Sequence, residues 1–97
     1  MGKAYALRYT DRADADIERL RPYDQRRVVN AIEIHLSHEP TRVSRSRLKR
    51  MDQPFWSQYR LRVDNCRVYY DVNDESRIVT ILRVFEKGTS QTPEHSS

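Results

Sequence analysis

The side chains best suited to chemistry lie between Phe55 and Lys87, where cations alternate with apolar residues. Because successive side chains of a strand point to opposite sides, such alternation separates an apolar face from a charged one. Guanidinium groups stay charged and match phosphate oxygens with paired donors. The pattern therefore predicts a strand face that binds a polyanion. Its cations are Arg60, Arg62, Arg67, Arg83 and Lys87.

A solubilising role is the alternative for each of these cations, because exposed strands often carry charges that protect their edges. Like charges on neighbouring strands cost stability, however, so a whole face of them favours a shared ligand that offsets the cost. Tyr69 has the parity of the cations and is a candidate for base stacking or hydrogen bonding. Trp56 is a second stacking candidate, but a large aromatic residue at the start of a strand more often belongs to a core.

Other chemistries find little support in the sequence. His35 and His38 are close together, but no cysteine or carboxylate spacing completes a metal site, so we expect no metal and no cofactor. Cys66 falls on the apolar parity, which predicts a small core residue and not a nucleophile. A glycine-rich phosphate loop is absent, because glycine occurs only at positions 2 and 88.

Length and composition indicate one small domain of 97 residues, with a formal net charge of +4 and a pI near 9.5. Such a balance permits a nucleic-acid partner. The single cysteine excludes an internal disulfide, and with no long apolar run or signal-like start we expect a cytoplasmic protein without a membrane partner. The positive charge is concentrated in one segment, whose basic residues are Arg42, Arg45, Arg47, Lys49, Arg50, Arg60, Arg62 and Arg67.

The N-terminal part reads as a strand and two helices. Lys3–Tyr9 alternates as a strand, and Thr10 is placed to cap a helix that continues for about ten residues. Pro22 breaks that helix, and Asp24 is expected to cap a second one that ends near Ser37. A short connection makes the two helices an antiparallel pair.

The remainder reads as strands joined by turns. Leu48–Met51 forms a short strand, Asp64-Asn65 suits a tight hairpin because both residue types tolerate positive φ, and Asn73–Ser76 is a second turn. These elements predict an α+β fold: an antiparallel sheet of about four strands with the helical pair packed on one face, in the order β-α-α-β-β-β. The domain is expected over residues 1–88, followed by a flexible tail over 89–97. The expected core residues include Val28, Ile32, Leu61, Val68, Tyr70, Ile78, Leu82 and Val84.

Three segments carry a resemblance to a known family: YRLRV at 59–63, CRVYYDV at 66–72 and IVTILRVFEKG at 78–88. They resemble the C-terminal half of the RelE/ParE superfamily of type II toxins. That superfamily has a basic strand, a short turn, a strand with Arg followed by hydrophobic-Tyr, and a last strand that closes on basic residues. RelE-like members cut messenger RNA on the ribosome, whereas ParE-like members poison DNA gyrase.

The resemblance implies roles for particular residues. Arg60 and Arg62 match the basic pair of the family's middle strand. Arg67 matches its phosphate-binding arginine, and Lys87 lies at the basic position that closes the last strand. RelE-like nucleases usually follow that position with a catalytic Tyr, whereas this chain continues with Gly88-Thr89-Ser90. The basic middle strand favours the RelE-like branch, so we expect a metal-independent, ribosome-dependent mRNA endoribonuclease that inhibits translation. A ParE-like gyrase inhibitor and a non-catalytic nucleic-acid-binding module are the alternatives.

Without a metal, RNA is cut when its 2′-OH attacks the adjacent phosphorus, which requires charge stabilisation on the phosphorane, a base and an acid. Arg62 and Arg67 suit the first role. Lys87 is a candidate base if crowding by other cations favours its neutral form, whereas Glu86 is predicted to face the core. The expected partners are messenger RNA on the ribosome and a cognate antitoxin that forms a hetero-oligomer with this chain. Contacts to the nucleic acid are expected from Arg45, Arg47, Lys49, Arg50, Tyr69 and Arg83.

Overall fold

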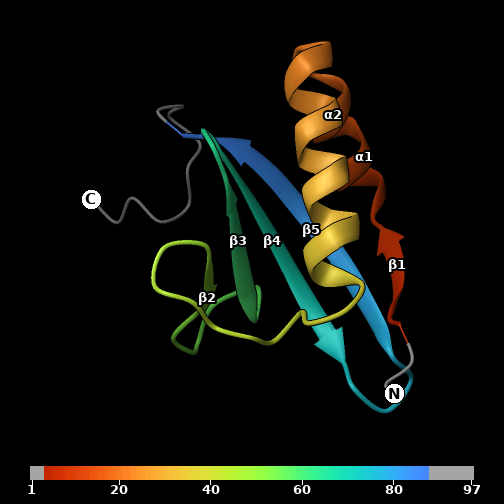
Figure 1. Ribbon diagram of the computed structural model, residues 1–97, viewed down its shortest axis with the longest axis vertical. Helices are drawn as coiled ribbons and strands as arrows, with labels where there is room; N and C mark the ends of the chain where they lie inside the picture. Colours follow the sequence, from red (N-terminus) through yellow and green to blue (C-terminus); the bar gives the residue numbers. More distant parts are fainter. Residues whose placement is uncertain (1–3, 88–97) are drawn as a thin grey trace.

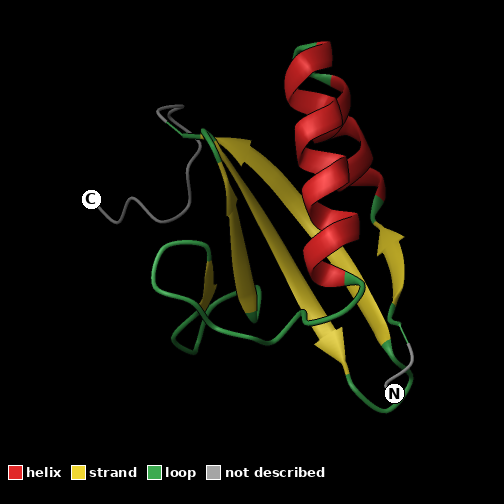
Figure 2. Ribbon diagram, viewed as in Figure 1, coloured by secondary structure: helices red, strands yellow, loops and turns green. Residues whose placement is uncertain are grey.

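The computed structural model describes residues 4–87 and consists of a layer of helices against a mostly antiparallel sheet (Figures 1 and 2). The sheet has five strands in the order β1-β5-β4-β3-β2, with β1 parallel to β5 and every other pair antiparallel. The predicted α+β fold is confirmed, although the sheet has five strands and the predicted first strand pairs parallel to β5. The elements are β1 (Ala6–Tyr9), α1 (Asp11–Glu18), α2 (Pro22–Ala31), the π-helical turn η1 (Ile32–Leu36), β2 (Leu48–Arg50), β3 (Tyr59–Val63), β4 (Cys66–Asn73) and β5 (Ile78–Glu86).

The two helices begin in different ways. Thr10 caps α1 as predicted, because its side-chain oxygen accepts a hydrogen bond from the Ala13 N–H at 3.1 Å. The first helix ends before Pro22, as predicted, but the prediction that Asp24 caps the next helix is wrong. Pro22 is the first residue of α2, and Arg21 stands at its N-cap. Proline suits that position because its backbone N–H, which would have no helical partner there, is missing and its φ is already helical.

The edge of β5 is covered first by β1 and then by α1. β1 pairs with β5 only as far as Ile81. Beyond that point, Thr10 donates its hydroxyl proton to the Leu82 carbonyl at 2.9 Å, and the Val84 N–H donates to Oδ2 of Asp16, also at 2.9 Å. The Asp16 side chain is only 3% exposed. Its carboxylate therefore replaces a strand as the partner of an edge N–H that would otherwise be buried without an acceptor.

Besides Arg19, whose Nη1 donates to Oδ1 at 3.4 Å, the charged partner of Asp16 is Arg83. Its Nε and Nη2 donate to the two carboxylate oxygens at 2.8 and 3.0 Å, as a bidentate pair. The hydrogen bond to Asp16 also raises the pKa of Arg83. Together with the Val84 N–H, these contacts fix α1 against one point of β5.

The pairing of β4 with β5 changes register at that same point. Tyr69 faces Arg83 and Tyr70 faces Ile81, so Leu82 is an extra residue in β5. Such a β-bulge turns every side chain that follows it to the opposite face of the strand.

The bulge makes part of the predicted core wrong. Ile78 and Leu82 are only partly buried, whereas Val79 and Ile81 are completely buried under the helices. Past the bulge the parity reverses, and Val84 is a core residue as predicted. The other predicted core residues are buried as expected, namely Val28, Ile32, Leu61, Val68 and Tyr70.

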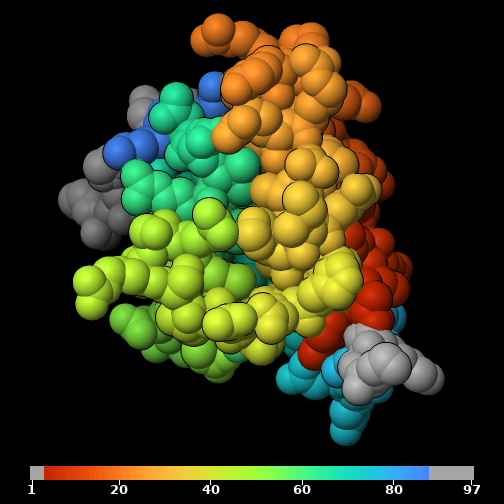
Figure 3. Space-filling model, in the orientation of Figure 1, coloured from red at the N-terminus to blue at the C-terminus, as the bar shows by residue number. Residues whose placement is uncertain are grey.

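The helices and a long connection cover one side of the sheet. Figure 3 shows α2 (orange) and the segment that follows it (yellow) over this side, meeting the β3–β4 hairpin. The Tyr70 hydroxyl donates to the Pro40 carbonyl at 2.6 Å, which ties the connection to the centre of the sheet. Burial raises the pKa of Tyr70, so the hydroxyl keeps the proton that this bond needs. Within residues 4–87, no helix has the length and apolar character that a bilayer-spanning segment requires.

We predict that truncation of Ile81 destabilises the protein more than truncation of its neighbour Leu82 at the bulge. Ile81→Ala should lower the free energy of unfolding by about 2–5 kcal/mol, because it leaves a cavity in a fully buried site. Leu82→Ala should cost clearly less, because its side chain is partly exposed on the other face. Urea denaturation of both variants measures the difference. An equal loss for the two variants would contradict the observed register.

Removal of the Asp16 carboxylate should lower the free energy of unfolding more than removal of an exposed charge does. Asp16→Ala removes the acceptor of the Val84 N–H and the partner of Arg83, and we expect a loss of about 3 kcal/mol in the free energy of unfolding. Asp16→Asn should lose less, because its amide oxygen still accepts from Val84. Glu18→Ala, at an exposed position of the same helix, is the control. If both alanine variants melt at the same temperature, Asp16 does not anchor α1.

Candidate nucleic-acid interface

Four cations lie in register on the sheet face opposite the helices. Their neighbours along each strand, among them Leu48, Leu61 and Val68, are buried in the core on the helix side. Because strand side chains alternate, the residues between them point to the other side. We call this surface the cationic face and define it as Lys49, Arg60, Arg62 and Arg67.

Strand pairing sets the spacing of the cationic face. Lys49 faces Arg60 across β2 and β3, and Arg62 faces Arg67 across β3 and β4. Directly opposed residues have Cβ atoms about 4.5–5.5 Å apart. Two guanidinium groups are thus attached within reach of one phosphate group, and a second pair of cations follows along the strands.

The β3–β4 turn fixes the position of Arg67. Asp64 adopts φ 52°, as the predicted tight hairpin requires, and its carboxylate is paired with Arg27 of α2. The Lys87 N–H donates to the Asn65 carbonyl at 2.5 Å, so the end of β5 lies beside the same turn. Lys87 itself is exposed. The structure therefore brings Lys87 to the end of the sheet where Arg62 and Arg67 are opposed.

The basic residues that precede β3 are spread around the sheet edge. Arg45 and Arg47 are exposed in the connection, and the Arg47 carbonyl accepts from the Arg62 N–H at 2.7 Å. Arg50 turns away from the cationic face, because its Nη1 donates to the hydroxyl of Tyr59 at 2.9 Å and Tyr59 packs on the helix side. Of the basic residues in this segment, only Lys49 is in register with the cations of β3.

Two of the expected contact residues have other surroundings. Tyr69 is completely buried, covered by the rings of Trp56 at 4.9 Å and of Phe55 and Phe85 at 6.0 Å each. This burial argues against a base stacking on Tyr69. Arg83 is engaged by Asp16, and its guanidinium lies 4.5 Å from the centre of the Phe85 ring.

Sequence reasoning missed the small apolar cluster on the charged side of the sheet. Its members are Met51, Phe55, Tyr69 and Phe85. Trp56 stacks on it but remains 45% exposed, although a core position is more common for such a residue. The signal was present, because Tyr69 and Phe85 share the parity of Arg67 and Arg83.

Cys66 and His35 lie outside the cationic face. Cys66 is buried, and burial raises the pKa of its thiol to about 11, which keeps it protonated and unreactive at neutral pH. His35 lines a recess beside Arg47, and its pKa is lowered by burial and then by the Arg47 charge. Across residues 4–87, no three or more His, Cys, Asp and Glu side chains are grouped to hold a metal ion. The positive charge of the cationic face is suited to binding phosphate.

Comparison with known proteins agrees with this fold. A family model described as the ParE toxin of the type II toxin-antitoxin system parDE matches residues 7–89. The toxin–antitoxin complex RelBE2 of Mycobacterium tuberculosis contains a chain 29% identical in sequence, with a TM-score of 0.79 over 92% of this chain and 98% of that one.

Two further solved structures resemble the chain more distantly. The archaeal RelE–RelB complex of Pyrococcus horikoshii has 21% identity and a TM-score of 0.63, with coverage of 89% and 98% of the two chains. A mutant of the E. coli toxin RelE in the free state has 20% identity and a TM-score of 0.67, with coverage of 91% and 87%. These two show the fold alone. No sequence match was found among curated proteins.

The resemblance seen in the three strand segments is thus confirmed. By the family match over residues 7–89, the chain belongs to the ParE toxin family of type II toxin–antitoxin systems, within the RelE/ParE superfamily.

Proposed function

We propose that this type II toxin is a metal-independent endoribonuclease that cuts messenger RNA on the ribosome. The observation that carries the proposal is the opposition of Arg62 and Arg67 on β3 and β4, with Lys49 and Arg60 in the adjoining row. Paired guanidinium groups on a rigid sheet match the oxygens of a phosphate. Their interaction strengthens as negative charge accumulates on the phosphorane, which is the condition for catalysis.

The proposed division of labour would make cleavage dependent on the ribosome. Guanidinium groups stay protonated and cannot serve as a base. Lys87, beside the turn that carries Arg67, is the proposed base that takes the proton of the 2′-OH as the 2′-oxygen bonds to phosphorus. The bond from phosphorus to the 5′-oxygen then breaks, and the leaving oxygen would take its proton from a group of the ribosome. A toxin that supplies mainly charge depends on a substrate held with its 2′-OH in line with the scissile bond, and the ribosomal A-site would hold the codon in that way.

A cognate antitoxin is the proposed protein partner. The related chains of Mycobacterium tuberculosis and Pyrococcus horikoshii were both solved as toxin–antitoxin complexes. An acidic or amphipathic antitoxin segment would neutralise the cationic face or pack a helix against the toxin, and would thereby keep RNA away. The pair would form a hetero-oligomer in the cytoplasm, where the ribosomes are.

Inhibition of DNA gyrase is the second candidate function. It is favoured by the family match, since the model that covers residues 7–89 is named for ParE of parDE. In that case the cations would contact a protein or DNA surface without a chemical step.

A direct comparison of the two targets tests the branch. Purified toxin is incubated with programmed ribosomes and the message ends are mapped, while gyrase supercoiling is assayed in parallel with the same toxin preparation. We expect codon-aligned cleavage with a 2′,3′-cyclic phosphate at the new end and unchanged gyrase activity. Intact message together with inhibited gyrase would replace this proposal by the second candidate.

Substitution of Arg67 tests the proposed chemistry most directly. Arg67→Ala should lower cleavage by about 10²–10³, as loss of one preorganised donor to a transition-state charge does, and growth arrest should disappear. Arg67→Lys should recover only part of the rate, because an ammonium group lacks the fork. Message cleavage and growth are measured for each variant, with circular dichroism to verify folding.

Arg26→Ala provides the matched control for Arg67→Ala. It removes the same charge from an exposed position of α2, and both the cleavage rate and growth arrest should stay at the wild-type level. A folded Arg67→Ala protein with wild-type toxicity would remove the phosphate contact from the mechanism.

A further inference from the structure

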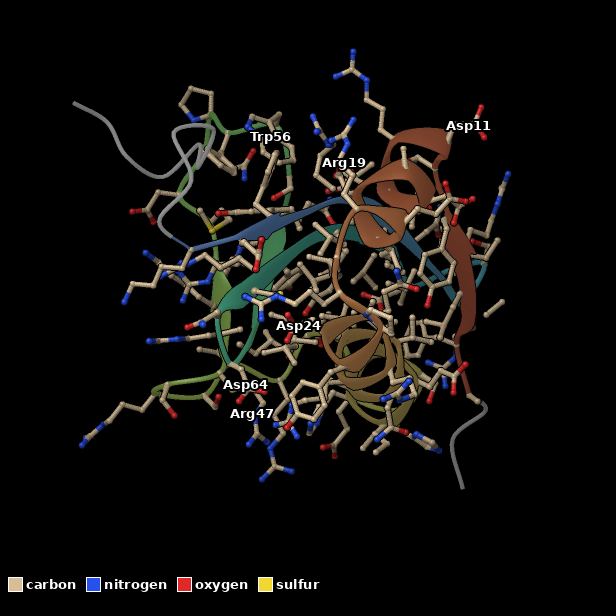
Figure 4. The ribbon with its side chains drawn as sticks, turned by 90° about the horizontal axis from the view of Figure 1, so that it is seen from above. Asp11, Arg19, Asp24, Arg47, Trp56 and Asp64 are labelled. Carbon is tan, nitrogen blue, oxygen red and sulfur yellow. The ribbon has the colours of Figure 1, made fainter. Side chains whose placement is uncertain are left out.

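An open groove lies beside the apolar cluster, between the start of α1 and the loop that precedes β3. Its volume is about 640 Å³. Figure 4 shows Trp56 and the start of α1, marked by Asp11, on one side of the β5 ribbon, while Asp24, Arg47 and Asp64 lie on the other. The groove is lined by Thr10, Asp11, Arg12, Trp56, Leu82, Arg83 and Phe85.

Trp56 lines this groove and is held in place by packing against two other aromatic rings. Its ring is nearly parallel to that of Phe55, with 26° between the planes and 5.0 Å between the centroids, and it also contacts the buried ring of Tyr69 at 4.9 Å. With 45% of the residue still exposed, much of the indole surface remains accessible from the groove. An aromatic ring held in place from behind can receive a planar ligand without first losing conformational freedom.

The groove adjoins the cationic face through shared residues. Phe85 lines the groove and is directly opposite Arg67 in the sheet. Tyr69, on which Trp56 rests, is directly opposite Arg60. Neighbouring strands are about 4.8 Å apart, so the stacking surface begins roughly one strand away from the cations.

We propose that this groove is a nucleobase subsite, in which one base of a single-stranded RNA stacks on Trp56 while the adjoining phosphates lie against Arg60 and Arg67. The inference rests on the proposed function, because it takes RNA as the ligand of the cationic face. Proteins that hold single strands combine a cationic track with aromatic side chains on which bases stack. Here the two components share a sheet and are set in register by the same strands.

The groove is lined by charges of both signs. Asp11 is exposed at the rim, where its carboxylate repels a phosphate and accepts a hydrogen bond from an exocyclic amino group of a base. Arg12 and Arg83 line the same groove, so positive charge is present there as well for the phosphates that flank the base. An acidic peptide could also meet these cations, but it has no planar base to stack on Trp56, which makes it the poorer occupant.

The fluorescence of the protein reports on the subsite directly, because Trp56 is the only tryptophan in the chain. The wild-type protein is titrated with a short single-stranded RNA and with an oligonucleotide of equal length and charge that lacks the bases. RNA should quench the emission, whereas the abasic strand should bind through its phosphates without quenching. Equal responses to the two strands would overturn the proposal.

Variants separate stacking from phosphate binding. Trp56→Leu should weaken RNA binding about tenfold in fluorescence anisotropy with labelled strands, and should leave abasic binding unchanged. Trp56→Phe should retain most of the RNA affinity, and melting temperatures verify that both variants fold. Tyr23→Leu, which removes a more exposed aromatic ring from α2, is the control and should bind like the wild type.

The outcomes for the subsite and for the proposed function are distinguishable. Message cleavage by the wild type, together with undiminished RNA binding by folded Trp56→Leu, overturns the subsite and leaves the endoribonuclease in place. Selective loss of RNA affinity in Trp56→Leu, together with intact message and inhibited gyrase, supports the subsite and overturns the endoribonuclease.

Discussion

The arrangement of sheet and helices depends on one buried carboxylate. β1 is too short to cover β5, and Asp16 accepts the edge N–H of Val84 at the point where pairing with β1 has ended. A buried acceptor of this kind is stable only when all its partners are in place. Arg83 supplies the opposite charge. The contact therefore determines where α1 lies, and it holds β5 beside the bulge at Leu82.

The bulge in turn gives the sheet two different faces. Because the parity of β5 reverses at Leu82, Val84 packs under the helices while Phe85 joins Tyr69 on the other side. Without the reversal, the apolar cluster that supports Trp56 would lack the Phe85 ring. The charged side of the sheet is thus a composite, in which an apolar platform lies next to the cations that β2, β3 and β4 provide. The apolar platform and the cations belong to different sets of contacts, so a substitution in one need not disturb the other.

The predictable parts of the structure are those in which one signal dominates. In β3, apolar and basic residues alternate, and Cys66, Arg67 and Val68 continue the pattern into β4. The register, the hairpin at Asp64 and the opposition of Arg62 and Arg67 therefore follow from the sequence. β5 is apolar at both parities from Ile78 to Leu82, and periodicity cannot locate a bulge in such a run. The burial of Tyr69 depends on the loop before β3 folding back onto the sheet, a long-range contact without a local signature.

The opposition of Arg62 and Arg67 also affects how the stability of this protein is to be understood. Like charges across a hairpin raise the free energy of the folded chain, and an anion between them lowers it again. An anion that binds only the folded state adds about 2.7 kcal/mol when present at a hundred times its dissociation constant. The melting temperature is then a property of the protein together with its counterions. A shift between chloride and phosphate buffers would measure occupancy of the sheet surface before any substrate is known.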